Sequence, residues 1–129
     1  MHKELEEKLF QRVPTLFNLG GDALTPFRFQ CSDGWFNILW GLCADLEPMV
    51  MEFESETGER FEVVQVKAKL GTLRFYVSHH TEAIDGRIAE AQEKSSRTCE
   101  VCGRPGKWLE SGYSIRVVCD THDHTLVEH

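Results

Sequence analysis

The sequence lacks long hydrophobic runs, internal repeats and an excess of basic residues. No stretch approaches the ~20 apolar residues that cross a bilayer, and residues 1–7 are charged where a secretory signal would have an apolar centre. We therefore expect a cytoplasmic protein. The absence of repeats and low-complexity tracts argues against a solenoid or a disordered tail. Lys and Arg number 14 against 21 Asp and Glu, a net charge of -7 that disfavours a general nucleic-acid binder.

The remaining composition is that of one ordinary globular domain. The 129 residues are 41% hydrophobic and 27% charged, which leaves room for one core and one small appended module. Five cysteines are an odd number, so a pure disulfide framework is disfavoured, and their spacing indicates a metal site. We expect an α+β core in residues 1–98, with a zinc-finger module in residues 99–129 packed on it as one structural unit.

Helical spacing of apolar residues predicts three helices, at residues 2–12, 34–47 and 81–97. Pro14 and Pro48 would end the first two helices, and Thr81 would cap the third. The helix at 34–47 is apolar over much of its circumference and is expected to be the core helix. We expect this helix to pack on the apolar face of the sheet, and Trp40→Ala would then cost ~3–5 kcal/mol if the Trp40 ring is fully buried.

From Val50 onward, apolar and polar residues alternate, which predicts strands. A strand near residues 50–56 and a turn at 57–59 lead into a hairpin built around Gly71. The fold class is therefore α+β: a three-stranded antiparallel meander packed on helices, with a C-terminal zinc-binding β-hairpin or treble-clef-like module. The inward residues of the hairpin are expected to be Val64, Val66, Leu73, Phe75 and Val77.

Two ligand pairs near the C-terminus predict a metal centre. Cys99 and Cys102 form the first pair, and Cys119 and His122 form the second, with sixteen residues between the pairs. Two residues between ligands allow a tight turn that aims both side chains at one ion, and Gly103 follows where such a turn needs positive φ. Three thiolates and an imidazole favour one structural Zn²⁺ per chain, with no position left for water or substrate.

The surroundings of these pairs predict a small finger. Residues 107–110 and 113–118 would form a hairpin around Ser111-Gly112, and a short terminal helix would follow the second pair. His124 is an alternative to His122 as the fourth ligand.

Other reactive side chains have structural interpretations beside the functional ones. His79 and His80 are adjacent on a strand and would point to opposite faces, so they cannot easily share a ligand. Cys31 is a candidate nucleophile or a small core residue, and Cys43 is expected to be core packing. We predict no catalytic residues.

The outer face of the predicted hairpin is a candidate partner-binding surface. Alternate strand residues share a face, so Gln65, Lys67, Arg74 and Tyr76 are expected side by side. A guanidinium, an ammonium and a phenol together can bind a carboxylate or a phosphate. The alternatives are a merely solvated face, or a binding surface on the finger around Trp108 and Tyr113.

Three strings carry a resemblance to a family of small, uncharacterised bacterial and prophage-borne proteins. They are Cys31-Ser-Asp-Gly-Trp35, Val64-Gln-Val-Lys67 through Gly71-Thr-Leu-Arg-Phe-Tyr76, and Thr98-Cys-Glu-Val-Cys-Gly-Arg-Pro-Gly106. The resemblance covers about residues 27–122 and implies an intracellular bacterial or phage setting, with accessory roles such as interference with host defence. Asp123-His124 also resembles the Asp-His pair of HNH-type nucleases, without the asparagine and second histidine that such a site uses.

These observations predict a non-enzymatic zinc-binding accessory protein that acts through protein–protein interaction. The first alternative is a nucleic-acid-binding regulator, supported by the finger and the basic hairpin face. Residues 99–129 contain five acidic and three basic side chains, whereas a finger that grips phosphate is usually basic. The second alternative is a small HNH-like nuclease.

Overall fold

The computed structural model describes residues 1–17, 27–112 and 114–123. The described elements are, in order, α1 (Lys3–Arg12), β1 (Phe29–Gln30), the 3₁₀ helix η1 (Asp33–Trp35), α2 (Phe36–Thr57), β2 (Val63–Lys69), β3 (Thr72–Val77), α3 (Glu82–Ser95), β4 (Lys107–Ser111) and β5 (Ser114–Val118). They confirm the α+β class and the helices expected near residues 2–12 and 81–97. The Thr81 hydroxyl caps α3 as predicted, accepting the Ile84 N–H at 3.1 Å.

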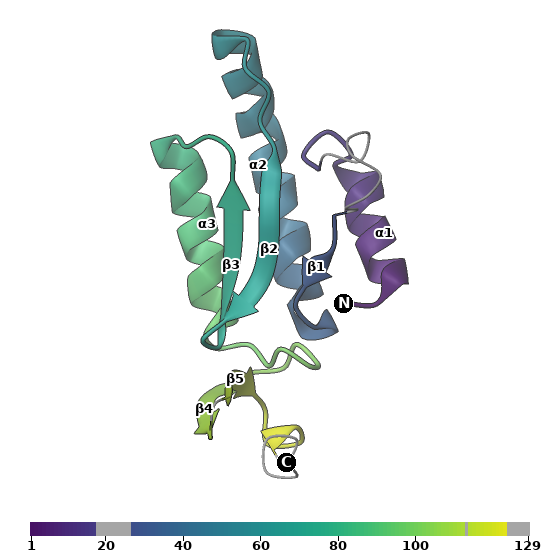
Figure 1. Ribbon diagram of the computed structural model, residues 1–129, viewed down its shortest axis with the longest axis vertical. Coiled ribbons are helices and arrows are strands. Elements are labelled where there is room, and N and C mark those ends of the chain that lie inside the picture. The colour runs from purple at the N-terminus through teal and green to yellow at the C-terminus, as the bar shows by residue number, and fades with distance from the viewer. Residues whose placement is uncertain (18–26, 113, 124–129) are drawn as a thin grey trace.

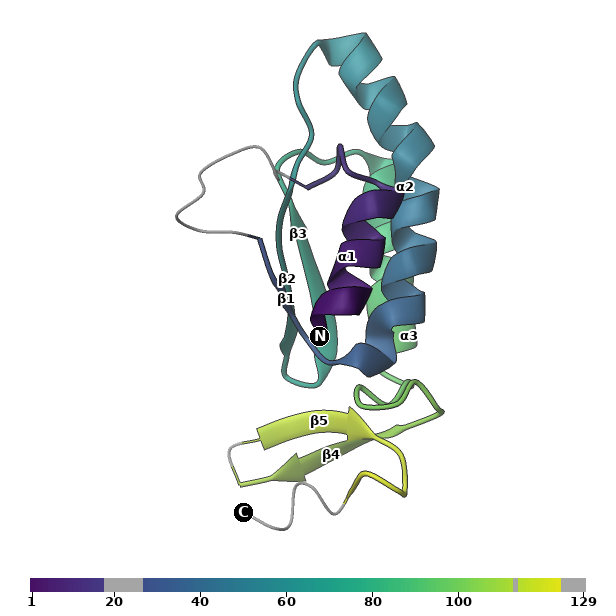
Figure 2. The same ribbon diagram turned by 90° about the vertical axis from the view of Figure 1, so that its right-hand side faces the viewer.

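The helices and the larger sheet form two layers. Strands β1, β2 and β3 make one sheet, and β4 and β5 make a separate hairpin. Figures 1 and 2 show α1, α2 and α3 on one face of the larger sheet, so no described helix covers its other face. The β4–β5 hairpin lies beyond the end of the sheet where the β2–β3 turn is found (Figure 2).

Helix α2 continues through Pro48, so both the helix end and the strand expected over residues 50–56 are wrong. A proline inside a helix removes one backbone hydrogen bond and costs ~3 kcal/mol. The apolar stripe outweighs this cost, because Val50 is buried and Phe53 packs against the core one turn later. The helix ends only at Gly58, which adopts a left-handed conformation with φ of 72°.

The larger sheet is mixed and is not an antiparallel meander. Strands β2 and β3 form the expected antiparallel hairpin. Strand β1, however, runs parallel to β2, with Phe29 opposite Val66. The reason is topological: α2 connects β1 to β2, and a helical crossover returns the chain in the same direction. Strand β1 has only two residues, too few to show the alternation of apolar and polar residues that would have predicted a strand there.

A β-bulge changes which valine of β2 enters the core. The register shifts between Val63 and Gln65, so Val63 is buried whereas Val64 is 60% exposed. The expectation that Val64 faces the core is therefore wrong. Val66 and the three inward residues of β3 are buried as predicted. The largest fully buried side chains include Trp35, Phe17, Phe61, Leu9, Leu16, Leu39, Leu46, Leu73 and Ile84.

The central tryptophan of the core is Trp35 and not Trp40. The Trp35 side chain is fully buried, and its indole N–H donates to the Thr98 carbonyl at 3.0 Å. Trp40 is 38% exposed. Its ring lies 5.8 Å from that of Phe36 and 6.0 Å from the Arg12 guanidinium carbon. The prediction that Trp40→Ala would cost ~3–5 kcal/mol is withdrawn, since that magnitude applies to a fully buried ring.

Backbone contacts join the start of α2 to the segment around residue 100. The Gly34 N–H donates to the Glu100 carbonyl at 2.7 Å, and the Ser32 N–H donates to the Glu100 carboxylate at 3.2 Å. A Cβ atom on Gly34 would lie 2.2 Å from the Cys99 carbonyl oxygen. The two backbones therefore approach as closely as only glycine permits. The division of the chain at residue 98 stays a prediction, but these contacts cross it.

Gly34→Ala is expected to lower the free energy of unfolding by ~1–3 kcal/mol, because the new methyl group must push two backbone segments apart. Gly41→Ala is the matched control, since a Cβ there meets nothing within 4 Å and the site is helical. The control should be neutral or up to ~1 kcal/mol more stable. Denaturant unfolding of both variants measures the difference. Equal stability of the two variants would contradict the close approach.

Candidate metal centre

Four side chains from two chain segments meet beside the β4–β5 hairpin. The ligand atoms of Cys99, Cys102, Cys119 and His122 all lie within 4.8 Å of one another. Cys99 and Cys119 are buried, His122 is half-buried and Cys102 is exposed. The structure thus brings together the four residues that the spacing predicts as ligands, and they can hold a metal ion.

The first pair sits on a tight turn. The Cys99 N–H donates to the Arg104 carbonyl at 2.7 Å, and the Gly103 N–H donates to the Cys99 carbonyl at 2.9 Å. Gly103 has φ of 83°, the positive value that the sequence predicts for it. This turn points the Cys99 and Cys102 side chains toward the same point.

The second pair begins where β5 ends. The His122 N–H donates to the Cys119 carbonyl at 3.0 Å, which curls the chain so that the imidazole faces the thiols. The His122 Nδ1 atom lies 3.2 Å from the Cys119 sulfur and 3.6 Å from the Cys99 sulfur. Nδ1 is therefore the nitrogen available to a metal. The alternative ligand His124 lies outside the described residues, as does most of the expected terminal helix.

The separations fit a tetrahedral site. Bond lengths of ~2.3 Å to sulfur and ~2.0–2.1 Å to nitrogen place the ligand atoms of tetrahedral zinc about 3.6–3.8 Å apart. The Cys102 and Cys119 sulfurs are 3.6 Å apart, and the Cys99–His122 separation is the same. The Cys119–His122 separation of 3.2 Å is shorter, and all four ligand atoms lie within 4.8 Å of one another. These four side chains could therefore hold one metal ion.

The electrostatics of the site favour the ligating form of Cys119. Partial desolvation acts to raise the pKa of this thiol, but hydrogen bonds with His122 and Cys102 outweigh it and lower the pKa to about 6. Cys119 is then mostly thiolate at neutral pH, and the thiolate is the form that binds metals.

Glu100 is a supporting residue that the sequence did not reveal. It lies between the first two cysteines and is only 6% exposed. Its carboxylate accepts the Ser32 N–H and lies 3.6 Å from the Arg116 Nε atom of β5. Glu100 therefore connects the cysteine turn both to the start of the core helix and to the hairpin. A glutamate at this position has no distinctive sequence signal, because its role depends on contacts with distant residues.

No family model, curated protein or solved structure matches this chain. The resemblance to small bacterial and prophage-borne proteins therefore stays a prediction. Within the described residues, no helix has the length and apolar character that a membrane crossing requires.

The remaining cysteines are packed in the core. Burial raises the pKa of Cys31 to about 12, and it does the same for Cys43. Both thiols stay protonated at neutral pH, which argues against Cys31 as a nucleophile. The core-packing interpretation fits both side chains.

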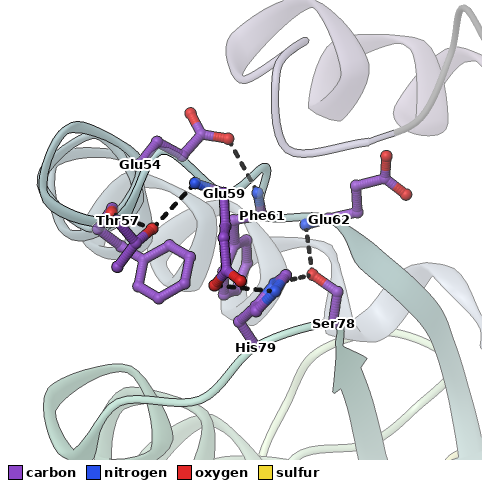
Figure 3. A network of polar contacts seen from close by, with 8 residues as sticks. Glu54, Thr57, Glu59, Phe61, Glu62, Ser78 and His79 are labelled. Carbon is purple, nitrogen blue, oxygen red and sulfur yellow. Dashed lines mark hydrogen bonds and ion pairs between the residues drawn. The ribbon is translucent and has the colours of Figure 1, made fainter.

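His79 and His80 have different side-chain partners. Figure 3 shows His79 between Ser78 and Glu59, with separations of 2.9 Å from Nδ1 to the Ser78 oxygen and 3.5 Å from Nε2 to the Glu59 carboxylate. The same serine oxygen accepts the Glu62 N–H at 2.8 Å. His80 instead lies 2.8 Å from Asp85. The His79 network fastens the turn after α2 to the end of β3.

The four residues of the candidate partner surface lie side by side on β2 and β3. In the β2–β3 register, Gln65 is opposite Tyr76 and Lys67 is opposite Arg74. The alternate residues Val66 and Phe75 are buried, so the four polar side chains belong to the other face of the sheet. Tyr76 is 41% exposed. The Arg74 Nε atom is buried without a hydrogen-bond partner. Of the alternative finger surface, Trp108 is 53% exposed, and Tyr113 lies outside the described residues.

Proposed function

We propose that this chain is a non-enzymatic, zinc-braced accessory protein that works by binding a protein partner. The observation that carries the proposal is the closed donor set of Cys99, Cys102, Cys119 and His122. Zinc in such a set has no open coordination position, so its contribution is to hold the fold together. Thiol ligands also suit a reducing cytoplasm. The resemblance of the sequence strings extends the proposal to a bacterial cell or a phage-infected host, in regulation or interference with host defence.

The metal would brace a hairpin whose two faces have different contacts. On one face, Leu109 and Val118 pack around the cysteines. On the other, the side chains of Trp108 and Ile115 lie within 3.2 Å of the position that a Cβ on Gly71 would occupy. The hairpin thus connects the ligand cluster to the β2–β3 turn. The turn, two pairs of ligands and the hairpin support a treble-clef-like arrangement.

The proposed working surface is the outer hairpin face of Gln65, Lys67, Arg74 and Tyr76. Lys67 and Arg74 have no carboxylate within 4.0 Å among the described residues, although most described arginines do. The chain has a net charge of -7, so acidic side chains are plentiful. Two neighbouring cations that pair with none of the described carboxylates favour a surface that binds an acidic partner. The fold itself does not require these side chains, because the core uses the opposite face.

A nucleic-acid-binding regulator is the second candidate. Two cations beside the exposed Tyr76 ring also resemble a surface on which bases stack while phosphates are neutralised. The overall negative charge and the acidic finger favour the protein partner. The HNH-like nuclease stays a sequence prediction, since His124 lies outside the described residues.

The double variant Lys67→Glu with Arg74→Glu tests the working surface. It should keep its zinc and its melting temperature, and it should recover partner protein from host lysate at least about tenfold less well, because losing one side of a hydrogen-bonded charge pair costs ~2–5 kcal/mol. Lys3→Glu with Lys8→Glu is the matched control, with the same charge change on the exposed side of α1. Undiminished recovery by the hairpin variant would contradict the proposal. If the hairpin variant recovers its partner normally but loses binding to single-stranded DNA, the result would favour the nucleic-acid-binding regulator.

A further inference from the structure

Strand β3 lies at one edge of the sheet, and its backbone N–H and C=O groups point alternately toward β2 and toward the free edge. Its neighbour in the sheet is β2, and no other described strand pairs with it. The Ser78 N–H just after the strand donates to the Glu62 carbonyl on the β2 side, whereas the Leu73 N–H donates to the Ser95 hydroxyl of α3. Successive residues of a strand point their N–H and C=O groups to opposite sides. The backbone groups of Phe75 and Val77 therefore point to the free edge, as those of Leu73 do.

Only one end of this edge is protected within the described chain. Ser95 satisfies the outward N–H of Leu73 at 2.9 Å. No corresponding side chain or strand among the described residues meets the outward N–H groups of Phe75 and Val77. Exposed edges of this kind are templates for another strand, and proteins usually block them. The β3 edge is therefore competent to receive an extended segment beside residues 75–77.

The side chains along this edge specify the charge of such a segment. Arg74 projects from β3 on the open sheet face, with Lys67 directly opposite on β2. The Arg74 Nε atom is buried and makes no hydrogen bond, a condition that costs free energy until an acceptor arrives. A strand added beside β3 would place its outer side chains ~4.5–5.5 Å from those of Arg74 and Tyr76, measured between Cβ atoms. A carboxylate opposite Arg74 would meet its guanidinium, and Lys67, one strand further away, would add positive charge behind it.

We propose that the free edge of β3 binds an extended acidic segment of the partner protein as a fourth strand, with alternate carboxylates beside Arg74 and Tyr76. The intervening side chains of that segment would point toward the helix layer, where Ile88 of α3 is half-buried. The partner motif is thus an alternation of acidic and apolar residues. This inference rests on the proposed function and specifies how its surface binds.

Amide hydrogen exchange of the full-length, zinc-loaded protein tests the inference. The probe is a soluble peptide of about ten residues, the length of a long strand, with alternating Glu and Val. In the free protein the Phe75 and Val77 amides should exchange faster than those of Arg74 and Tyr76, which bond to β2. Adding the peptide should slow exchange at Phe75 and Val77 at least about tenfold. Two control peptides should not slow exchange at Phe75 and Val77. One has the same composition with all Glu residues before all Val residues, and the other is N-methylated at alternate residues.

The variants separate the possible failures. Arg74→Glu should abolish the protection, and Lys3→Glu with Lys8→Glu should leave it intact. Peptide binding that perturbs Lys67 and Arg74 without slowing exchange at Phe75 would overturn strand addition while leaving the proposed surface standing. The same holds if the alternating peptide does not bind but the Lys67→Glu, Arg74→Glu variant still loses its protein partner. Protection produced by an oligothymidylate and not by the peptide would overturn the inference in favour of a nucleic acid.

Discussion

Replacing Cys102 with serine is expected to abolish stoichiometric zinc binding and to unfold the segment from residue 99 to residue 123. Serine keeps the size of the side chain but removes the thiolate, and a small metal-bound module draws most of its folding free energy from the ion. In zinc-finger peptides that contribution is ~10–16 kcal/mol. The zinc content measured by metal analysis should fall from one ion per chain to a small fraction of that value. Amide exchange across β4 and β5 should rise by orders of magnitude.

Cys43→Ala is the control for this experiment. Cys43 is a buried cysteine of α2 that has no place in the ligand cluster. It should retain one zinc per chain, with only the modest loss of stability that a small core truncation brings. A strong chelator added to the wild-type protein should reproduce the Cys102→Ser exchange pattern. Purified wild-type protein without zinc, or unchanged zinc in Cys102→Ser, would refute the proposed metal centre.

Trp35→Ala is expected to lower the free energy of unfolding by ~3–5 kcal/mol. The indole ring is fully buried, and removing it also leaves the Thr98 carbonyl without its donor. For a chain of this size the loss corresponds to a melting temperature lower by about 10–20 °C. The substitution would destabilise the core and also the segment at Thr98, which leads directly into the ligand cluster.

Trp40→Ala provides the comparison with an identical change in side chain only five residues away. Trp40 is 38% exposed, and its ring lies beside the half-buried ring of Phe36 and the Arg12 guanidinium. Its removal should cost about 1 kcal/mol or less. Parallel thermal melts of the two variants measure the contrast. Similar melting temperatures would mean that Trp35 does not have the central place assigned to it.

The sequence predicted best those features that local chemistry determines. The spacing of Cys99, Cys102, Cys119 and His122 was enough to group the ligands, because turn geometry near a metal is short-range. The Thr81 cap and the antiparallel β2–β3 hairpin were predicted correctly for the same reason. Each of these patterns is completed within a few residues, so distant parts of the fold could not change it.

The errors arose where tertiary packing overrode a local signal. Pro48 is a strong stop signal, yet the buried stripe through Val50 carries α2 onward. The bulge beside Val64 reverses its side chain, and a one-residue shift of this kind leaves no mark in the alternation. Trp35 and Trp40 both lie in the most apolar segment, and only the position of the neighbouring chain decides which one is buried. Glu100 could not be recognised because its partners are far away in the sequence.

The contacts between the start of α2 and the residues around Cys99 also bear on how the protein is made. The Trp35–Thr98 and Ser32–Glu100 hydrogen bonds join residues that are 63 and 68 positions apart. A ribosome adds ~5–20 residues per second, so the indole of Trp35 waits several seconds for its acceptor while the core is being synthesised. The most deeply buried tryptophan is thus closed off by a segment that emerges 63 positions after it. Synthesis would then favour a nascent core that completes its packing together with, and not before, the cysteine turn.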